Sequence, residues 1–111
     1  MTRVFAPQQP SRFDTSTRLW IPTMNMQPAA KYGELVVLLP PNANRLHTVP
    51  LLEALKAGMA DFTKDDWLVA VGDPSLIAAA ACIASRKTGG ILRLLKWDRL
   101  TSDYIAAEMT I

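Results

Sequence analysis

The residues best suited to chemistry lie in three loops that follow predicted strands. One loop carries Asn44 and Arg45 near His47, and the next reads Gly72-Asp-Pro-Ser75. The third carries Asp98 and Arg99. In α/β sheets, ligands bind beyond the carboxyl ends of the parallel strands, where such loops meet. This arrangement is compatible with a site for a nucleotide or another small anion, whose ligand-binding residues would be Asn44, Arg45, Asp73, Ser75, Asp98 and Arg99.

Each of these residues also has a simpler structural interpretation. Asp73 stands directly before Pro74 and Ser75, which is typical of a helix N-cap, and its carboxylate would disfavour a phosphate at that helix end. A lone loop histidine such as His47 is usually solvated, and Asp98 with Arg99 would stabilise a hairpin turn. The sequence leaves the ligand site and these structural roles open as alternatives.

The motifs that the chain lacks argue against catalysis. Pro40-Pro41 stands where a dinucleotide fold would have its glycine-rich turn, and there is no phosphate loop or Gly-x-Ser-x-Gly elbow. With one histidine and one cysteine, the usual zinc sites are excluded. We therefore predict no catalytic residue, no metal and no cofactor, with Cys82 as a small buried residue and Asp61, Asp65 and Asp66 in a solvated turn.

Residues 1–33 form a basic, partly apolar N-terminal arm in this interpretation. The arm carries Arg3, Arg12, Arg18 and Lys31 against a single acidic residue, Asp14. Its apolar side chains suit docking onto the chain's own sheet or onto another protein. The predicted partner or subunit contacts are Phe13, Arg18, Trp20, Met24 and Met26.

Single-stranded nucleic acid is a less favoured partner for the arm. Arg12, Phe13, Arg18 and Trp20 interleave basic and aromatic residues, a pattern that can hold a single strand. However, the net charge of the chain is only +2, and the positive excess lies in the arm alone.

Periodicity places the regular elements mainly after residue 33. Residues 1–16 are predicted to be irregular, with a possible short strand at 17–21, and residues 34–111 to form a single α/β domain. In that domain we expect strands at 34–39, 67–71 and 91–97, helices at 48–62 and 74–88, and a hairpin strand at 104–111. In the last strand Ile105, Ala107, Met109 and Ile111 alternate with more polar residues, which predicts one buried and one solvated face.

This order predicts a compact three-stranded parallel βαβαβ core, half-Rossmann or flavodoxin-like, with an antiparallel C-terminal edge strand. If the four predicted strands lie in the order 2-1-3-4, the helices cover opposite faces of the sheet, and the apolar early strands favour this. If the order is 1-2-3-4, both helices lie on one face, and the arm or a second subunit must cover the other.

Three stretches resemble a family of small uncharacterised α/β proteins encoded by tailed bacteriophages. They are Ile21-Pro-Thr-Met-Asn-Met-Gln-Pro-Ala-Ala30, Val71-Gly-Asp-Pro-Ser-Leu-Ile77 and Leu95-Lys-Trp-Asp-Arg99. The resemblance covers residues 17–111. It implies a phage origin and expression in the host bacterial cytoplasm, and it supplies no catalytic residue.

These observations lead to a functional hypothesis. We expect a non-enzymatic phage accessory protein, a small binding module that engages a host or phage protein and self-associates as a homo-oligomer. Small-molecule binding at the sheet edge and single-strand binding by the arm are the alternatives. The apolar runs are too short to span a bilayer, so no membrane partner is expected.

Overall fold

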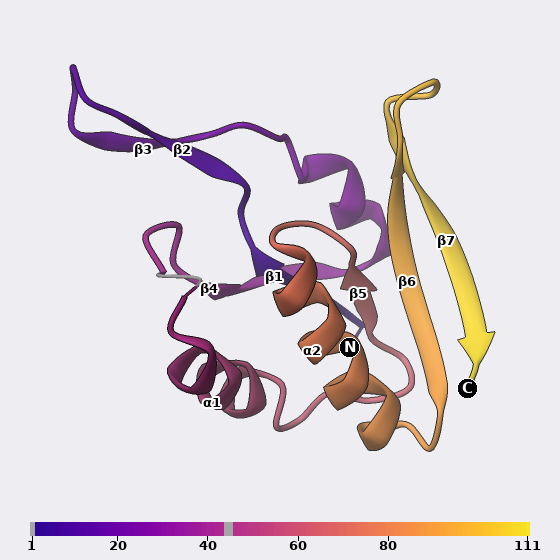
Figure 1. The fold of residues 1–111 in the computed structure, drawn as a ribbon. Coiled ribbons are helices and arrows are strands. Elements are labelled where there is room, and N and C mark those ends of the chain that lie inside the picture. Colours follow the sequence, from indigo (N-terminus) through magenta and orange to yellow (C-terminus); the bar gives the residue numbers. More distant parts are fainter. Residues whose placement is uncertain (1, 44–45) are drawn as a thin grey trace.

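The computed structural model describes residues 2–43 and 46–111, which form a five-stranded sheet, a separate two-stranded hairpin and three helical segments (Figure 1). The order in the large sheet is β4-β1-β5-β6-β7. The elements are β1 (Arg3–Gln8), β2 (Ser11–Asp14), β3 (Leu19–Pro22), the 3-10 helix η1 (Gln27–Tyr32), β4 (Glu34–Leu39), α1 (Thr48–Gly58), β5 (Trp67–Val69), α2 (Pro74–Lys87), β6 (Ile91–Asp98) and β7 (Asp103–Thr110).

The N-terminal strand β1 lies inside the sheet, so the prediction of irregular structure over residues 1–16 is wrong. β1 pairs in parallel with β4 on one side and with β5 on the other. Pro7 argued against an inner strand because proline cannot donate to a ladder. Its place is tolerated because the pairing with β5 ends at Phe5↔Leu68, before Pro7 is reached.

The fold class is therefore confirmed as mixed α/β with an antiparallel edge, but the parallel part differs from the prediction. Four strands, β4, β1, β5 and β6, are parallel, where the sequence predicted three. The predicted strands follow one another in chain order, as in the second alternative, with β1 inserted between the first two. β6 and β7 form the expected antiparallel pair.

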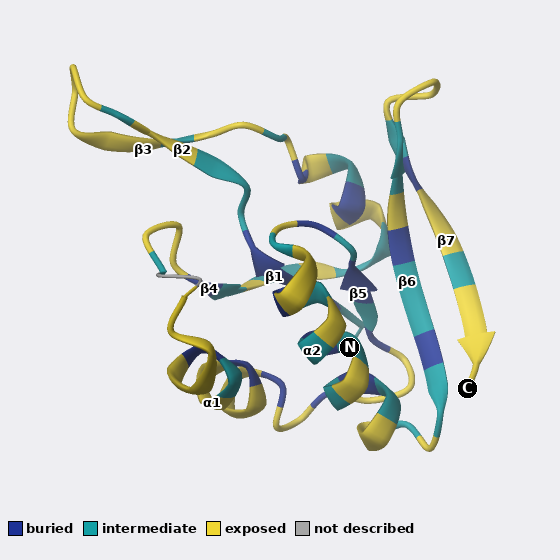
Figure 2. Cartoon of the chain, viewed as in Figure 1, coloured by how far each residue is buried: buried dark blue, intermediate teal, exposed yellow. Residues whose placement is uncertain are grey.

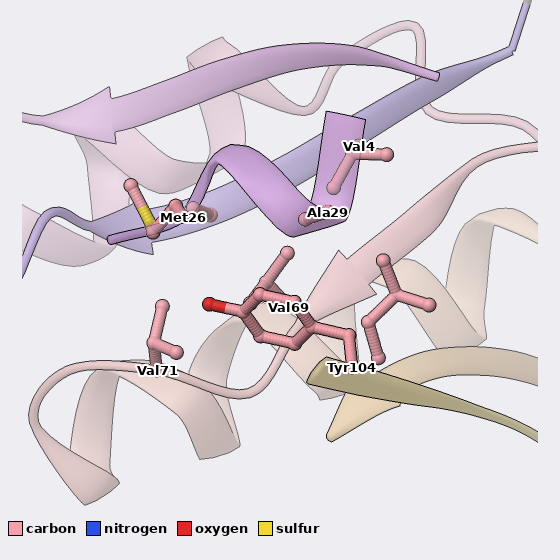
Figure 3. Close-up of a cluster of buried hydrophobic side chains, with 8 residues drawn as sticks. Val4, Met26, Ala29, Val69, Val71 and Tyr104 are labelled. Atoms are coloured by element: carbon pink, nitrogen blue, oxygen red, sulfur yellow. The ribbon is translucent and has the colours of Figure 1, made fainter. Parts of the chain in front are cut away.

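The two faces of the sheet are covered by different parts of the chain. Phe5 and Leu68 point toward the helices and pack with Met59 and Phe62 and with the alanines of α2. On the opposite face Val4 and Val69 pack against Met26 and Ala29 of the segment around η1, and Tyr104 joins them (Figure 3). Both α-helices thus cover one face, and residues 24–32 of the predicted arm cover the other.

The boundaries of α2 follow the predicted signals. Asp73 is the N-cap, and its carboxylate accepts a hydrogen bond from the Ser75 backbone N–H at 3.1 Å. Gly89 follows the C-cap at φ 68°, and the Gly90 N–H donates to the Ser85 carbonyl at 2.8 Å, as in a Schellman motif. Cys82 lies on the exposed side of this helix, so the prediction that it is buried is wrong.

The acidic turn before β5 is only partly solvated. Asp61 and Asp65 are exposed as predicted, whereas Asp66 is buried, with 1 % of its surface exposed. Its carboxylate accepts hydrogen bonds from the backbone N–H groups of Arg3 (2.9 Å) and Thr63 (2.8 Å) and from the Arg3 guanidinium (3.2 Å). The prediction of a solvated turn therefore fails at Asp66.

Candidate functional site

A pocket of about 500 Å³ opens at the carboxyl ends of three parallel strands. β1 contributes Gln8, the loop after β4 contributes Pro41 and Ala43, and the segment between β5 and α2 contributes Gly72, Asp73 and Pro74. The remaining lining comes from the hairpin strands, which contribute Ser11 and Trp20, and from the residues that flank them, Gln9, Pro10 and Thr23. This is the place at which α/β sheets bind ligands.

The described lining of this pocket is mostly uncharged. Asp73 is the charged side chain among these residues, and it serves the N-cap of α2. Gln8 donates its Nε2 to the Pro40 carbonyl at 2.8 Å, and Gln9 donates its Nε2 to the Met24 carbonyl at 2.6 Å. Much of the polar lining thus holds the surrounding loops together.

The structure brings together only part of the predicted ligand site. Asp73 lines the pocket, and Ser75 is hydrogen-bonded to it. Asp98 and Arg99 are absent from the described lining and lie at the β6–β7 turn, where Asp98 accepts from the Leu100 N–H and the Thr101 hydroxyl. Asn44 and Arg45 lie outside the described residues.

Sequence reasoning missed the contribution of β1 to this pocket. Gln8 to Ser11 were assigned to an irregular arm, so nothing placed them at the sheet edge. The apolar triplet Val4-Phe5-Ala6 was the signal that could have identified the strand that positions them.

The hairpin formed by β2 and β3 extends away from the large sheet (Figure 1). It carries three exposed apolar side chains: Phe13 (46 %), Leu19 (62 %) and Trp20 (41 %). Phe13 and Trp20 are register partners, and their ring centroids lie 5.5 Å apart in an edge-to-face arrangement. Most of the hairpin is coloured as exposed in Figure 2, and both rings of the pair are partly exposed, although Trp20 also lines the pocket.

The turn of the hairpin presents positive charge. Arg18 adopts φ 58°, a left-handed conformation that is uncommon for residues other than glycine, and its N–H donates to the Asp14 carbonyl at 2.7 Å. The Asp14 carboxylate is engaged by Ser16 N–H and the Thr17 hydroxyl. Arg12 and Arg18 are both exposed on this hairpin.

The five predicted partner contacts divide into two groups. Phe13, Arg18 and Trp20 lie on the hairpin and are exposed. Met26 is instead buried in the chain's own core, and Met24 packs against the same cluster. The arm thus docks partly on its own sheet, as one of the two alternatives held, and leaves the hairpin outside.

The described residues contain neither a metal-binding cluster nor a helix that could span a membrane. No group of His, Cys, Asp and Glu among them is arranged to hold a metal ion. None of the described helices has the length and hydropathy needed to cross a membrane.

Comparison with known proteins gives a match to a family model. No curated protein and no solved structure matches the chain. The model of one protein family, described as phage Pam3 gp32-like protein, matches residues 2–111. The resemblance to phage proteins is thereby confirmed, and the chain belongs to the phage Pam3 gp32-like protein family.

Proposed function

We propose that this phage protein is a non-enzymatic accessory protein that works in the host bacterial cytoplasm by binding another phage or host protein through its β2–β3 hairpin. The observation that carries the proposal is the solvent-exposed Phe13–Trp20 pair on a hairpin outside the main sheet. Its partner would offer an apolar cleft with acidic residues at the rim.

The low intrinsic stability of a two-stranded hairpin supports a role in binding. An isolated two-stranded hairpin is marginally stable in water, and burial of its apolar residues by a partner would stabilise it. Tryptophan and arginine are enriched among the residues that dominate binding energy at protein interfaces. Arg18 retains a long cationic side chain at a backbone conformation that glycine would adopt without strain, which supports a role for that side chain.

The structure gives less support to binding of single-stranded nucleic acid. A stacking platform needs free aromatic faces, whereas Phe13 and Trp20 pack edge to face on each other. Three basic side chains outside the hairpin, Arg3, Lys31 and Arg93, are paired with Asp61, Asp103 and Glu108, which partly neutralises the positive charge of the chain.

The test compares tagged wild-type protein with a Phe13→Ser/Trp20→Ser variant in phage-infected cells. Leu100→Ser is the matched control, because Leu100 is an exposed apolar residue on the other hairpin turn, β6–β7. After crosslinking and purification, we expect the same partner protein with the wild type and with Leu100→Ser, and its loss with the double variant. Equal recovery of that partner with all three proteins would refute the role of the hairpin.

A small-molecule site in the 500 Å³ pocket is the second candidate function. The described lining has a carboxylate and no basic side chain, so it favours a neutral or cationic polar ligand over a free anion. Native mass spectrometry of gently purified protein tests this. A bound mass of a few hundred daltons that disappears in Thr23→Trp, which fills the pocket, but persists in Phe13→Ser would support this second function, and a bare chain would argue against it.

A further inference from the structure

The strand β7 forms one edge of the large sheet and, apart from the carboxylates of Asp103 and Glu108, lacks the usual protection of an edge. Exposed edge strands in natural proteins are commonly blunted by lysine, proline, a bulge or a covering segment. β7 (Asp103–Thr110) is eight residues long, pairs without interruption with β6 and contains no lysine, proline or glycine. The side chains of Ile105 and Met109 are 49 % and 40 % exposed, although their alternation predicted a buried face. The buried member of the strand is Tyr104.

The directions of the backbone groups of β7 follow from its hydrogen bonds. The Ile111 N–H donates to the Gly90 carbonyl, toward β6, at 2.6 Å. Because these directions alternate along an antiparallel strand, Ala106, Glu108 and Thr110 direct their N–H and C=O groups away from β6. The hydrogen bond of Leu95, the register partner of Ala106, supports this assignment. The Leu95 carbonyl accepts from the Ala70 N–H at 3.0 Å, on the side of β6 that faces away from β7, so Leu95 and Ala106 are not hydrogen-bonded to each other.

The first outward position of the strand is already occupied within the chain. The Tyr104 N–H donates to Asp103 Oδ1 at 2.8 Å, and the Tyr104 carbonyl accepts from the Tyr32 hydroxyl at 3.3 Å. The outward groups available to another strand are therefore those of Ala106, Glu108 and Thr110. Figure 1 shows no element on the outer side of β7 among the described residues.

We propose that β7 pairs antiparallel with β7 of a second copy of this chain about a two-fold axis at Ala107, joining the two sheets into one. Ala106 then forms a hydrogen-bonded pair with Glu108 of the second copy, and Glu108 with Ala106. On the helix-covered face Ile105 lies opposite Met109 of the second copy, so both exposed apolar residues are paired.

This register is selected by charge and by the free backbone groups. A two-residue shift in one direction places the two Glu108 side chains opposite each other, which is unfavourable. The same shift in the other direction places Glu108 opposite Tyr104, whose backbone groups are bonded to Asp103 and Tyr32, so only the Ala106–Ala106 pair remains. In the Ala107 register Tyr104 lies opposite Thr110, and both Ala106–Glu108 pairs remain. In the Ala107 register Glu108 faces an alanine, and it keeps its contact with Arg93, whose Nε lies 3.7 Å from its carboxylate. The edge is thus complementary to itself, which identifies the occupant as a second copy.

A charge pair at Ala106 tests both the dimer and the register. Ala106 is exposed, so Ala106→Glu and Ala106→Lys change the edge with little effect on the core. In the dimer, Ala106→Glu creates two symmetric Glu–Glu pairs with Glu108, and we expect dimer affinity to fall about tenfold. Ala106→Lys creates two attractive pairs, and we expect affinity equal to or above that of the wild type. Light scattering and native mass spectrometry across a concentration series measure both.

Disulfide trapping gives an independent reading of the register. In a Cys82→Ser background, Ala107→Cys places two cysteines at a non-hydrogen-bonded pair of the dimer, with Cα atoms about 4.5 Å apart, close enough to crosslink on oxidation. Ile105→Cys is the control, because that residue faces position 109 of the second copy. We expect a crosslinked dimer only with Ala107→Cys. A wild type that stays monomeric at about 100 µM, equal effects of the two Ala106 variants, or equal crosslinking at 105 and 107 would overturn the proposal.

Discussion

Asp66 is a buried carboxylate with several hydrogen bonds, although it lies in an acidic stretch of sequence that is typical of a solvated turn. Asp66 joins the start of β1 to the turn before β5 through the Arg3 backbone, the Arg3 guanidinium and the Thr63 backbone. Burial by itself would raise the pKa of Asp66, but the hydrogen bonds from Thr63 and Arg3 and the Arg3 charge outweigh it, so the net effect is a lowered pKa. One carboxylate thus fixes the position of β1 against β5.

Replacement of this carboxylate has a predictable dependence on pH. Because the pKa of Asp66 is lowered in the folded state, its contribution is complete above the unfolded pKa of about 3.9 and is lost as the pH falls through the folded value. We expect Asp66→Asn to lower the free energy of unfolding by about 2–4 kcal/mol at pH 7 and to reduce the loss of stability below about pH 4. Urea unfolding between pH 7 and pH 3 measures both effects. The exposed neighbour is the control: Asp65→Asn should leave both unchanged, and equal effects of the two variants would contradict this assignment.

At the scale of elements, helix α2 is defined by its two ends. Asp73 caps its start, and Gly89 takes a left-handed conformation just past its end. A Cβ at position 89 would have no atom within 4 Å, so the backbone conformation alone accounts for the glycine. We predict that Gly89→Ala lowers the free energy of unfolding by about 1 kcal/mol, measured by chemical denaturation. A loss below experimental error would show that the helix end relaxes without this conformation.

The two ends of the β2–β3 hairpin lie next to each other at the edge of the domain. The Thr23 N–H donates to the Pro10 carbonyl at 2.8 Å, so the chain leaves and re-enters the domain at one place. We expect that replacing residues 11–22 with Asn-Gly will preserve the far-UV spectrum and change the melting temperature by only a few degrees, while removing partner binding. Unfolding of this variant would mean that the hairpin supports the core and would weaken its assignment as a binding element.

The sequence was sufficient for elements with strong periodicity or clear end signals. The strand at 34–39, the helix beginning at Pro74 and the C-terminal hairpin all lie where predicted. β1 was missed because a short apolar triplet before Pro7 has no period of its own, and its strand structure depends on β4 and β5. Asp98 and Arg99 do not join Asp73 at the pocket because the strands that precede them differ in length. β5 ends at Val69, whereas β6 continues to Asp98, and the longer β6 carries the β6–β7 turn away from the pocket.

At the scale of the whole molecule, the sheet has one well-covered face and one lightly covered face. Two helices pack on the first, and the short segment around η1 packs on the second. β1 contributes to both, since Val4 and Ala6 point to one face and Phe5 to the other. The strand β1 therefore helps to hold both core clusters together.

Deletion of this strand tests that conclusion. We predict that a chain lacking residues 2–8 does not fold, because β4 and β5 lose their shared neighbour and both core clusters lose their central side chains. Amide hydrogen exchange and near-UV circular dichroism would show a loss of protection and of fixed aromatic packing. A cooperative unfolding transition in the truncated chain would contradict this account.

The position of β1 between β4 and β5 also affects how the chain folds during synthesis. β1 leaves the ribosome before both of its neighbours: β4 follows only after the hairpin and η1 have been made, and β5 only after α1 as well. Val4, Phe5 and Ala6 therefore have no neighbouring strand until β4 emerges and lack their second neighbour until Trp67 to Val69 emerge. Both pairings are distant in sequence, which slows folding. In an infected cell the nascent chain thus carries an incompletely covered apolar segment until both neighbouring strands have been made, a period in which it can be bound by chaperones.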